Sequence, residues 1–327
     1  MRAGDRRALI GDIGGTHARF AICDVDELSV TQFVVFQTWL FSSLQDAIRH
    51  YLDSIPDKPK TAGFAIAGDV FGNTVTMARA PWSFTRDDIA ESCGVKRIHF
   101  VSDFEAEALA LPYLNAHDLA TLQEGDTDPA GNMLVLGPGS GFGCAALIRQ
   151  SDRSLAIDSF AGHMGFSAAN VRETAVLKAL RNALGYAPLH DVLSARGLEA
   201  IYRVLTAEAG MNTVSLTATD IARLAGDGED AVAEDALDCF AAILARIAGD
   251  MALAFNARGG VFLGGGVSPK ILRTLRKPAF QQLFRDKGDK AEFLESLPLK
   301  VMLANDAGLR GAALAVSERY PMQSLQD

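Results

Sequence analysis

Cysteine and runs of like charge are both scarce in this chain of 327 residues. The four cysteines, Cys23, Cys93, Cys144 and Cys239, lie too far apart for a Cys-x-x-Cys zinc motif, and we expect no disulfide framework. Free thiols in a reducing compartment are the default expectation. The 31 basic residues form no Lys/Arg run and the net charge is −9, which argues against nucleic acid as a partner.

The chain also lacks an apolar run suited to a membrane. The apolar segment after the basic residues 1–7 stops at Asp12, which is too short for a signal peptide. The longest uncharged window, 129–148, contains several glycines and Pro138, which are poor material for a spanning helix. With 49% hydrophobic and 22% charged residues the composition is ordinary for a globular protein. We therefore expect a soluble, cytoplasmic protein of about two domains, at ~150 residues each, with no membrane contact.

Two glycine-bearing hairpins are predicted, one at the start of each half. Short apolar segments at 8–11 and 18–23 flank Asp12-Ile13-Gly14-Gly15-Thr16. The segments 133–136 and 145–148 flank a second glycine cluster in the same way. Glycines between two short apolar runs are typical of a β-hairpin. The chain is therefore expected to be α/β with two related halves.

The remaining periodicity predicts alternating strands and helices. Helices dominate from 172 to 257, and we expect 112–127 to be a crossover between the halves. The other expected strands are 30–36, 62–66, 75–77, 97–101, 261–263 and 300–303, and the clearest helices are 44–52, 105–111, 231–255 and 309–316.

Three glycine clusters follow apolar strands, at 12–16, 137–143 and 264–266. Glycine at a strand end lets backbone N–H groups approach a ligand, and successive amides form an anion-binding concavity. Three such places in one chain suggest a ligand with several phosphates. The alternative is that each cluster is only a tight turn. No Gly-Lys pair occurs and no cluster fits G-x-G-x-x-G, so the common P-loop and dinucleotide motifs are excluded.

The clusters carry a family resemblance. Residues 11–19, Gly-Asp-Ile-Gly-Gly-Thr-His-Ala-Arg, resemble the first phosphate motif of bacterial glucokinases, which belong to the actin/hexokinase/Hsp70 superfamily. Residues 136–143 resemble the second phosphate motif, with Ser140 where Thr is usual, and 262–267 resemble the adenosine motif. Other matching segments fall in the family's order over nearly the whole chain: Pro81-Trp82, Ser102-Asp103-Phe104, Gly162-His163, Leu193-Ser194, Phe284 to Gly288 and Gly308-Leu309.

The resemblance implies a two-domain actin-like ATPase fold of the ribonuclease H-like class, with a cleft between the domains. The small domain would be 1–113 plus 306–327, whose last helix returns to pack on it, and the large domain 114–305. ATP would bind in the cleft beside the sugar, Asp12 would act through Mg²⁺ and water, and the protein would be a homodimer. The implied nucleotide-binding residues are Gly11, Asp12, Ile13, Gly14, Gly15, Thr16, Gly137, Gly139, Ser140, Gly141, Gly264, Gly265 and Gly266.

By resemblance, Asp103 is the general base that takes the proton of the sugar hydroxyl. Its alternative role is structural, because Ser102-x-x-Glu105 is a capping box and an acidic residue favours a helix N-terminus. His163 would bind a sugar hydroxyl by the same resemblance, and its alternative is an ordinary surface histidine.

Four positions depart from the family pattern at the implied sugar site. Ser102 and Arg79 stand where asparagine is usual, and Phe160 and His190 stand where glutamate is usual. Each lost hydrogen bond to a sugar hydroxyl costs about 0.5–1.5 kcal/mol, so we expect weakened binding of glucose. Arg79 and Phe160 would suit a ligand with an anionic or an apolar substituent. The alternative is that the local alignment is off by a residue, as at His190 or Asp191, or that neighbours compensate.

The resemblance therefore predicts a glycolytic hexose kinase that transfers the γ-phosphoryl group of ATP to the 6-hydroxyl of glucose or a related sugar. Two alternatives stay open. One is a kinase for a different or modified sugar. The other is a catalytically weak paralogue that binds ATP or sugar and regulates another process.

Overall fold

The computed structural model describes residues 6–70, 72–77, 82–95, 97–150, 153–212 and 215–317. Their contacts divide into two compact units. Unit 1 takes its described residues from Met1–Leu114, Asp152–Ile157 and Ala304–Asp327, and unit 2 takes them from Asn115–Ser151 and Asp158–Leu303. The domain boundaries expected from the sequence, after 113 and before 306, stay a prediction.

Unit 1 contains a five-stranded mixed sheet in the order β3-β2-β1-β4-β8. β1 (Arg7–Ile13) and β2 (His17–Asp24) form the predicted antiparallel hairpin, and β2 pairs antiparallel with β3 (Ser29–Gln37). β1 pairs in parallel with β4 (Thr61–Ile66), and β4 pairs in parallel with β8 (Arg97–Ser102). A separate antiparallel sheet holds β5 (Gly68–Asp69), β6 (Thr74–Met77) and β7 (Ser83–Thr85).

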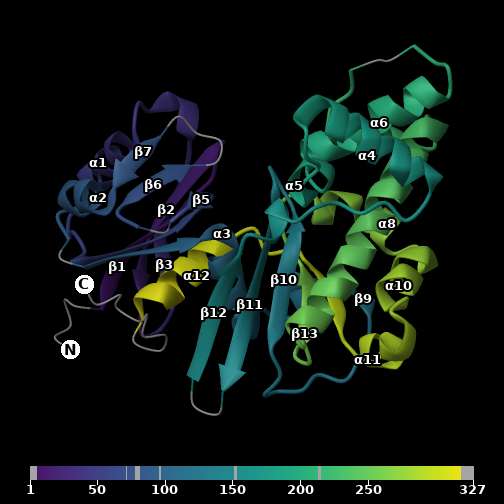
Figure 1. Cartoon of the computed structure of the whole chain (residues 1–327). Helices are drawn as coiled ribbons and strands as arrows, with labels where there is room; N and C mark the ends of the chain where they lie inside the picture. Colours follow the sequence, from purple (N-terminus) through teal and green to yellow (C-terminus); the bar gives the residue numbers. More distant parts are fainter. Residues whose placement is uncertain are drawn as a thin grey trace. The chain divides into compact units, whose positions relative to one another are not determined.

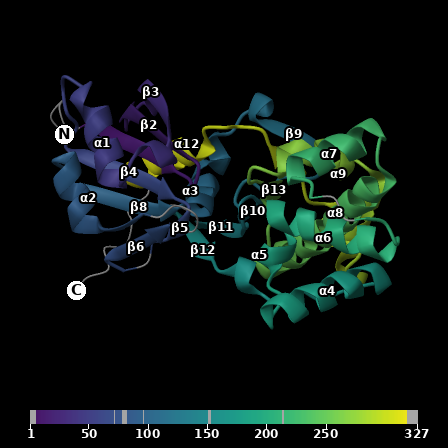
Figure 2. The same ribbon diagram turned by 90° about the horizontal axis from the view of Figure 1, so that it is seen from above.

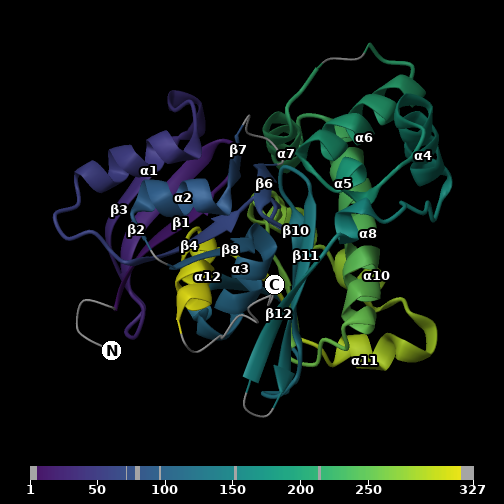
Figure 3. The same cartoon turned by 60° about the vertical axis from the view of Figure 1, so that its left-hand side comes forward.

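Helices cover both faces of the five-stranded sheet. α1 (Leu44–Asp53) and α2 (Arg86–Cys93) bury their apolar sides on one face, in a core that includes Phe64 of β4. Side chains alternate between the faces of a strand, so the neighbouring Gly63 points the other way. There α12 (Ala307–Val316) lies beside α3 (Asp103–Ala110), as Figure 3 shows.

The contact of α12 with the sheet depends on glycine. A Cβ atom on Gly63 would lie 2.6 Å from the carbonyl oxygen of Ala312, and one on Gly311 would lie 2.0 Å from the carbonyl oxygen of Ala106 in α3. The final helix therefore packs directly on the backbone of unit 1, as the resemblance implied.

A six-stranded sheet has the order β12-β11-β10-β13-β14-β9, and its strands belong to unit 2 except for residues 153–157 of β12, which are grouped with unit 1. The β10–β11 hairpin was predicted. The segment 112–127, which we expected to be a crossover between the halves, also contains an edge strand that pairs with β14. The strands are β9 (Leu119–Gln123), β10 (Met133–Pro138), β11 (Phe142–Gln150), β12 (Arg153–Ser159), β13 (Gly260–Leu263) and β14 (Leu299–Met302).

One long helix organises the rest of unit 2. α8 (Ala231–Ala254) has 24 residues and packs with α6 (Ala195–Glu208), α7 (Ala218–Asp227) and α10 (Pro278–Arg285), as Figure 2 shows in part. Within the described residues, no helix is both long and apolar enough to span a membrane. The other helices are α4 (Val171–Leu184), α5 (Leu189–Val192), α6 (Ala195–Glu208), α7 (Ala218–Asp227), α9 (Leu272–Leu275), α10 (Pro278–Arg285) and α11 (Ala291–Glu295).

The two sheets repeat one strand pattern, as the paired hairpins in the sequence suggested. In unit 1 the antiparallel pair β2–β1 continues through the parallel strands β4 and β8. In unit 2 the antiparallel pair β11–β10, labelled in Figure 1, continues through the parallel strands β13 and β14.

An ion pair inside unit 2 fixes α4 to α8. The side chain of Glu173 is fully buried, and Arg246 binds it through two contacts of 2.9 and 2.6 Å. Glu173 also accepts hydrogen bonds from the Ala169 amide at 2.8 Å and the Asn170 side chain at 2.9 Å. Loss of Arg246 would leave a buried carboxylate without its cation.

We expect Arg246→Leu to lower the free energy of unfolding by about 3–5 kcal/mol, because an uncompensated buried charge is costly. Arg172→Leu is the matched control, since Arg172 of α4 pairs with Asp235 at the surface, at 3.1 Å. That exposed pair should contribute about 0–1 kcal/mol. Urea unfolding of both variants measures the difference, and equal losses would show that the buried pair has no special weight.

Candidate active site

The first glycine cluster forms the turn between β1 and β2. The Gly14 N–H donates to the carbonyl oxygen of His17 at 2.9 Å and closes the turn. Thr38 holds the turn from outside, because its hydroxyl donates to the Gly15 carbonyl oxygen at 2.8 Å and its N–H to that of Thr16 at 3.0 Å. The N–H groups of Gly15 and Thr16 take no part in these bonds.

Asp12 lies near the end of β1, with its side chain 17% exposed. Arg19, directly opposite on β2, donates to its carboxylate at 2.8 Å. On the other side, a Cβ on Gly308 would lie 2.9 Å from the Asp12 carboxyl carbon, so only glycine lets the first turn of α12 come this close. Burial raises the pKa of the Asp12 carboxyl above its ordinary value, and the charge of Arg19 opposes that rise.

Asp103 shares a sheet edge with Asp12. β1, β4 and β8 are parallel, with Asp12 level with Ala65 and Ala65 level with Val101. Neighbouring strands are about 4.8 Å apart, which puts Asp12 and the start of α3 about 10 Å apart at the carboxyl ends of these strands. Ligands of open α/β sheets bind at this edge.

The capping box at the start of α3 is present. The Ser102 hydroxyl accepts the Glu105 N–H at 3.0 Å, and Glu105 accepts the Ser102 N–H at 3.4 Å. Ser102 is only 4% exposed, so its hydroxyl serves the helix. Asp103 is partly exposed, and its carboxylate accepts the Phe104 N–H at 3.0 Å.

The second and third glycine clusters meet in unit 2, at the ends of the adjacent parallel strands β10 and β13. A Cβ on Gly137 would lie 2.1 Å from the carbonyl oxygen of Gly264. The Val267 N–H donates to the Pro138 carbonyl oxygen at 3.0 Å, which ties the two turns together. Gly265 has a φ of +73° and its Cβ would lie 2.5 Å from the same oxygen, so both turns require glycine.

Other glycines of these clusters are not required by the fold. At Gly14 and Gly139 the chain itself leaves room for a Cβ. A Cβ on Gly14 would be 3.4 Å from its nearest neighbour, and one on Gly139 would be 3.8 Å from the Gly266 nitrogen. The Gly139 N–H also closes its own turn, donating to the Gly141 carbonyl oxygen at 2.7 Å. Packing within the chain does not explain these two glycines.

Three of the residues assigned to sugar binding come together in unit 2. Phe160 precedes the short 3-10 helix η5 (Ala161–His163), and His190 lies in α5. The His163 ring is perpendicular to that of His190, with centroids 4.8 Å apart, and 6.2 Å from that of Phe160. Arg79, another of the four altered positions, lies outside the described residues.

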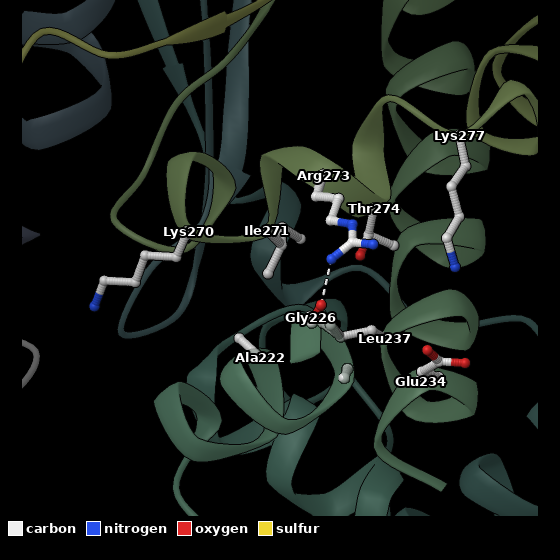
Figure 4. A pocket seen from close by; sticks show the side chains of 10 residues that line it. Ala222, Gly226, Glu234, Leu237, Lys270, Ile271, Arg273, Thr274 and Lys277 are labelled. Atoms are coloured by element: carbon white, nitrogen blue, oxygen red, sulfur yellow. Dashed lines mark hydrogen bonds between the residues drawn. The ribbon is translucent and has the colours of Figure 1, made fainter. Parts of the chain in front are cut away.

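A pocket of about 150 Å³ opens in unit 2 between α7, α8 and α9 (Figure 4). Its wall combines apolar groups such as Leu237 and Ile271 with the cations Lys270 and Arg273. Arg273 donates to the carbonyl oxygen of Gly226 at the end of α7. The pocket begins just past the Gly264–Gly266 turn, in the 3-10 helix η6 (Ser268–Ile271).

Comparison with known proteins identifies the family of this chain. A family model described as glucokinase matches residues 9–319. The chain belongs to the glucokinase family. The glucokinase of Caulobacter vibrioides is 35% identical over 315 residues, covering 94% of this chain and 95% of its own. The glucokinase of Xanthomonas euvesicatoria is 34% identical over 324 residues, covering 96% of each chain.

Solved structures agree on the fold. The crystal structure of a glucokinase from an Antarctic psychrotroph has a TM-score of 0.83 and 32% identity, covering 95% of this chain and 98% of that one. A ROK family glucokinase from Streptomyces griseus, in complex with glucose and AMPPNP, has a TM-score of 0.64 and 19% identity, covering 94% and 98%. These glucokinases share the actin-like ATPase fold expected from the sequence.

Sequence reasoning missed the partner of Asp12. Arg19 was seen as part of the first motif but was given no role. The hairpin register supplies the missing signal, because a tight turn centred on Gly15 and Thr16 places Arg19 directly opposite Asp12. The cysteines, in contrast, have no place in the site: all four are buried free thiols, and burial raises the pKa of each to about 12.

The two classes of glycine can be separated by stability. We expect Gly137→Ala to destabilise unit 2 by about 1–3 kcal/mol, because its Cβ collides with backbone. Gly139→Ala should leave stability within about 0.5 kcal/mol, since its Cβ meets only an ordinary contact. Thermal unfolding of the two proteins tests this, and a comparable drop in Tm for both would refute the distinction.

Proposed function

We propose that this protein is an ATP-dependent hexose kinase that transfers the γ-phosphoryl group of ATP to the 6-hydroxyl of glucose or a related sugar. The observation that carries the proposal is the family match over residues 9–319, which includes Asp12, Asp103 and all three glycine clusters. Phosphoryl transfer depends on positioning and charge neutralisation more than on covalent chemistry. Strand-end turns and placed carboxylates can supply both.

The glycine turns are proposed to hold the nucleotide. In unit 1 the amides of Gly15 and Thr16 are positioned by Thr38 rather than by the turn bond. In unit 2 the turns around Gly139 and Gly265 meet, and the Cβ position of Gly139 faces the Gly266 amide. A phosphate group held by backbone N–H groups there would explain why glycine is present where the fold does not need it.

Asp12 is proposed to act through Mg²⁺. Among the described residues, no group of three or more His, Cys, Asp and Glu side chains could hold a metal ion. A single carboxylate nevertheless fits Mg²⁺, which keeps several waters and takes its remaining ligands from substrate phosphates. When bound, the ion supplies charge neutralisation at the transferred group. Arg19 donates a hydrogen bond of 2.8 Å to the Asp12 carboxylate and so fixes its orientation at the carboxyl end of β1.

Asp103 is proposed as the general base. It lies in the first turn of α3, where an acidic side chain is favourable because the N-terminal end of a helix dipole is positive. The Phe104 N–H fixes one carboxylate oxygen, and the group stays partly exposed. A sugar hydroxyl within hydrogen-bonding distance would pass its proton to this carboxylate as the phosphoryl group is transferred.

We expect Asp103→Asn to lower kcat by ~10²–10⁴ on any active sugar, because the amide cannot take the proton. ATP affinity should remain close to that of the wild type. Glu105→Gln is the control, since it keeps the capping partner of Ser102 without altering the base. Coupled ADP-release kinetics measure kcat, and full turnover by Asp103→Asn would remove the assignment.

We expect Gly139→Ala to weaken nucleotide binding at least ~10-fold, the equivalent of 1.4 kcal/mol. The added methyl group would occupy the space that faces the Gly266 amide. Calorimetric titration with an ATP analogue measures the change, and Gly226→Ala is the control, because its Cβ would meet nothing within 4 Å. Unchanged affinity in Gly139→Ala would place the phosphates elsewhere.

We further propose that the enzyme is a cytoplasmic homodimer that acts in glycolysis. The support is the family relationship. Cross-linking or sedimentation of the purified protein would decide its oligomeric state.

A further inference from the structure

Phe160, His163 and His190 form one aromatic surface in unit 2. His163 packs edge-on against both neighbours, at 86° to His190 and 67° to Phe160. Edge-to-face pairs of this kind stabilise one another. Phe160 is nevertheless 59% exposed, and Met164, which follows His163 in the sequence, is 48% exposed. The cluster thus presents a contiguous apolar face to solvent. Single exposed aromatic side chains are common, but a contiguous apolar patch indicates a binding surface.

The backbone holds the aromatic surface rigidly. The segment carrying Phe160 and His163 is joined to the one carrying His190 by a β-bridge between Gly165 and Pro188. Hydrogen bonds of 2.8 Å run from the Phe166 N–H to the Ala187 carbonyl oxygen and from the Leu189 N–H to that of Met164. The hydroxyl of Tyr186 donates to the His163 carbonyl oxygen at 3.1 Å. A surface ordered in advance loses less conformational entropy when a ligand binds.

The aromatic surface adjoins the second glycine turn. A Cβ on Gly141 would lie 3.8 Å from the Cβ of His190, and one on Gly162 would lie 3.4 Å from it. The Ala195 N–H, just beyond α5, donates to the Gly139 carbonyl oxygen at 3.1 Å. The rings and the turn proposed to hold phosphate are therefore neighbouring parts of one rigid unit.

Among the described residues, the carboxylate of Asp191 lies beside the rings and disfavours an anionic ligand. Asp191 places a carboxylate oxygen 3.4 Å from the Nε2 atom of His190. A negative substituent on a ligand would meet this carboxylate. The ring of Phe160 accepts no hydrogen bond from a hydroxyl, so a hydroxyl lying on it would lose its bonds to water without replacement.

We propose that the aromatic surface selects a hexose that carries an apolar substituent, an aryl or alkyl group, in preference to free glucose. The apolar group packs on Phe160 and leaves water, while His163 and His190 remain able to bind a hydroxyl of the ring. This inference rests on the kinase function proposed above and names the substrate class of that enzyme.

The test compares phenyl β-glucoside, whose 6-hydroxyl is free, with glucose. We expect the wild-type protein to give a kcat/KM about 10-fold or more higher for phenyl β-glucoside, the low end of what an apolar group contributes in a binding site. Phe160→Glu should lower the ratio of the two kcat/KM values at least 10-fold. Phe33→Glu is the matched control, because Phe33 of β3 is 52% exposed and lies outside the aromatic surface. Its ratio should equal that of the wild type.

Two outcomes separate this inference from the proposed function. If the wild type prefers glucose and Phe160→Glu leaves the ratio unchanged, the substrate class is wrong and the kinase function stands. If neither sugar is phosphorylated, the kinase function fails. Calorimetric titration with phenyl β-glucoside in the absence of ATP then tests whether the aromatic surface binds the apolar sugar. Binding that Phe160→Glu abolishes would support the aromatic surface, and absence of binding to the wild type would overturn it.

Discussion

The close approach of two strand-end turns in unit 2 is the constraint on which the candidate site depends. Gly137 and Gly264 meet backbone to backbone, with space for no side chain between them. This contact follows from the parallel pairing of β10 with β13, which brings the carboxyl ends of both strands to one edge. Backbone amides distant in sequence are thereby gathered without any charged side chain. An acidic protein can bind an anion in this way, because the positive partial charge comes from the backbone.

The same strand pattern gives unit 1 a different chemistry. There the parallel strands β1, β4 and β8 carry acidic residues at their carboxyl ends, Asp12 on the first and Asp103 just past the last. Each carboxylate interacts with groups that are close to it in the sequence. Asp12 has Arg19 across the hairpin, and Asp103 has the first turn of α3. The repeated topology thus supplies equivalent sheet edges, and local residues decide whether an edge presents amides or carboxylates.

Local signals in the sequence predicted most of the fold. The hairpin turns and the capping box of α3 depend on neighbouring residues, and the structure contains them. The edge strands β9 and β12 were missed. β9 is five residues long and is recognisable only by its pairing with β14, nearly 180 residues later in the chain. Such a pairing is set by tertiary packing, which overrides weak local preference.

Local and long-range features of the sequence can also be distinguished in the candidate site. The glycine clusters could be found from sequence because a turn leaves a local trace. The sequence does not show which of these glycines the fold needs. That depends on which backbone atoms lie opposite each glycine in the folded chain. The aromatic surface is also a long-range product, since a bridge between Gly165 and Pro188 brings His190 to His163. The acids at the strand ends and the rings of η5 and α5 are therefore built on separate elements. In the enzyme proposed above, substitutions on η5 and α5 would change the residues assigned to the sugar without disturbing the strand ends. This separation would let one chain carry Asp12 and Asp103 at its strand ends while Phe160 and His190 stand where the resemblance predicted carboxylates.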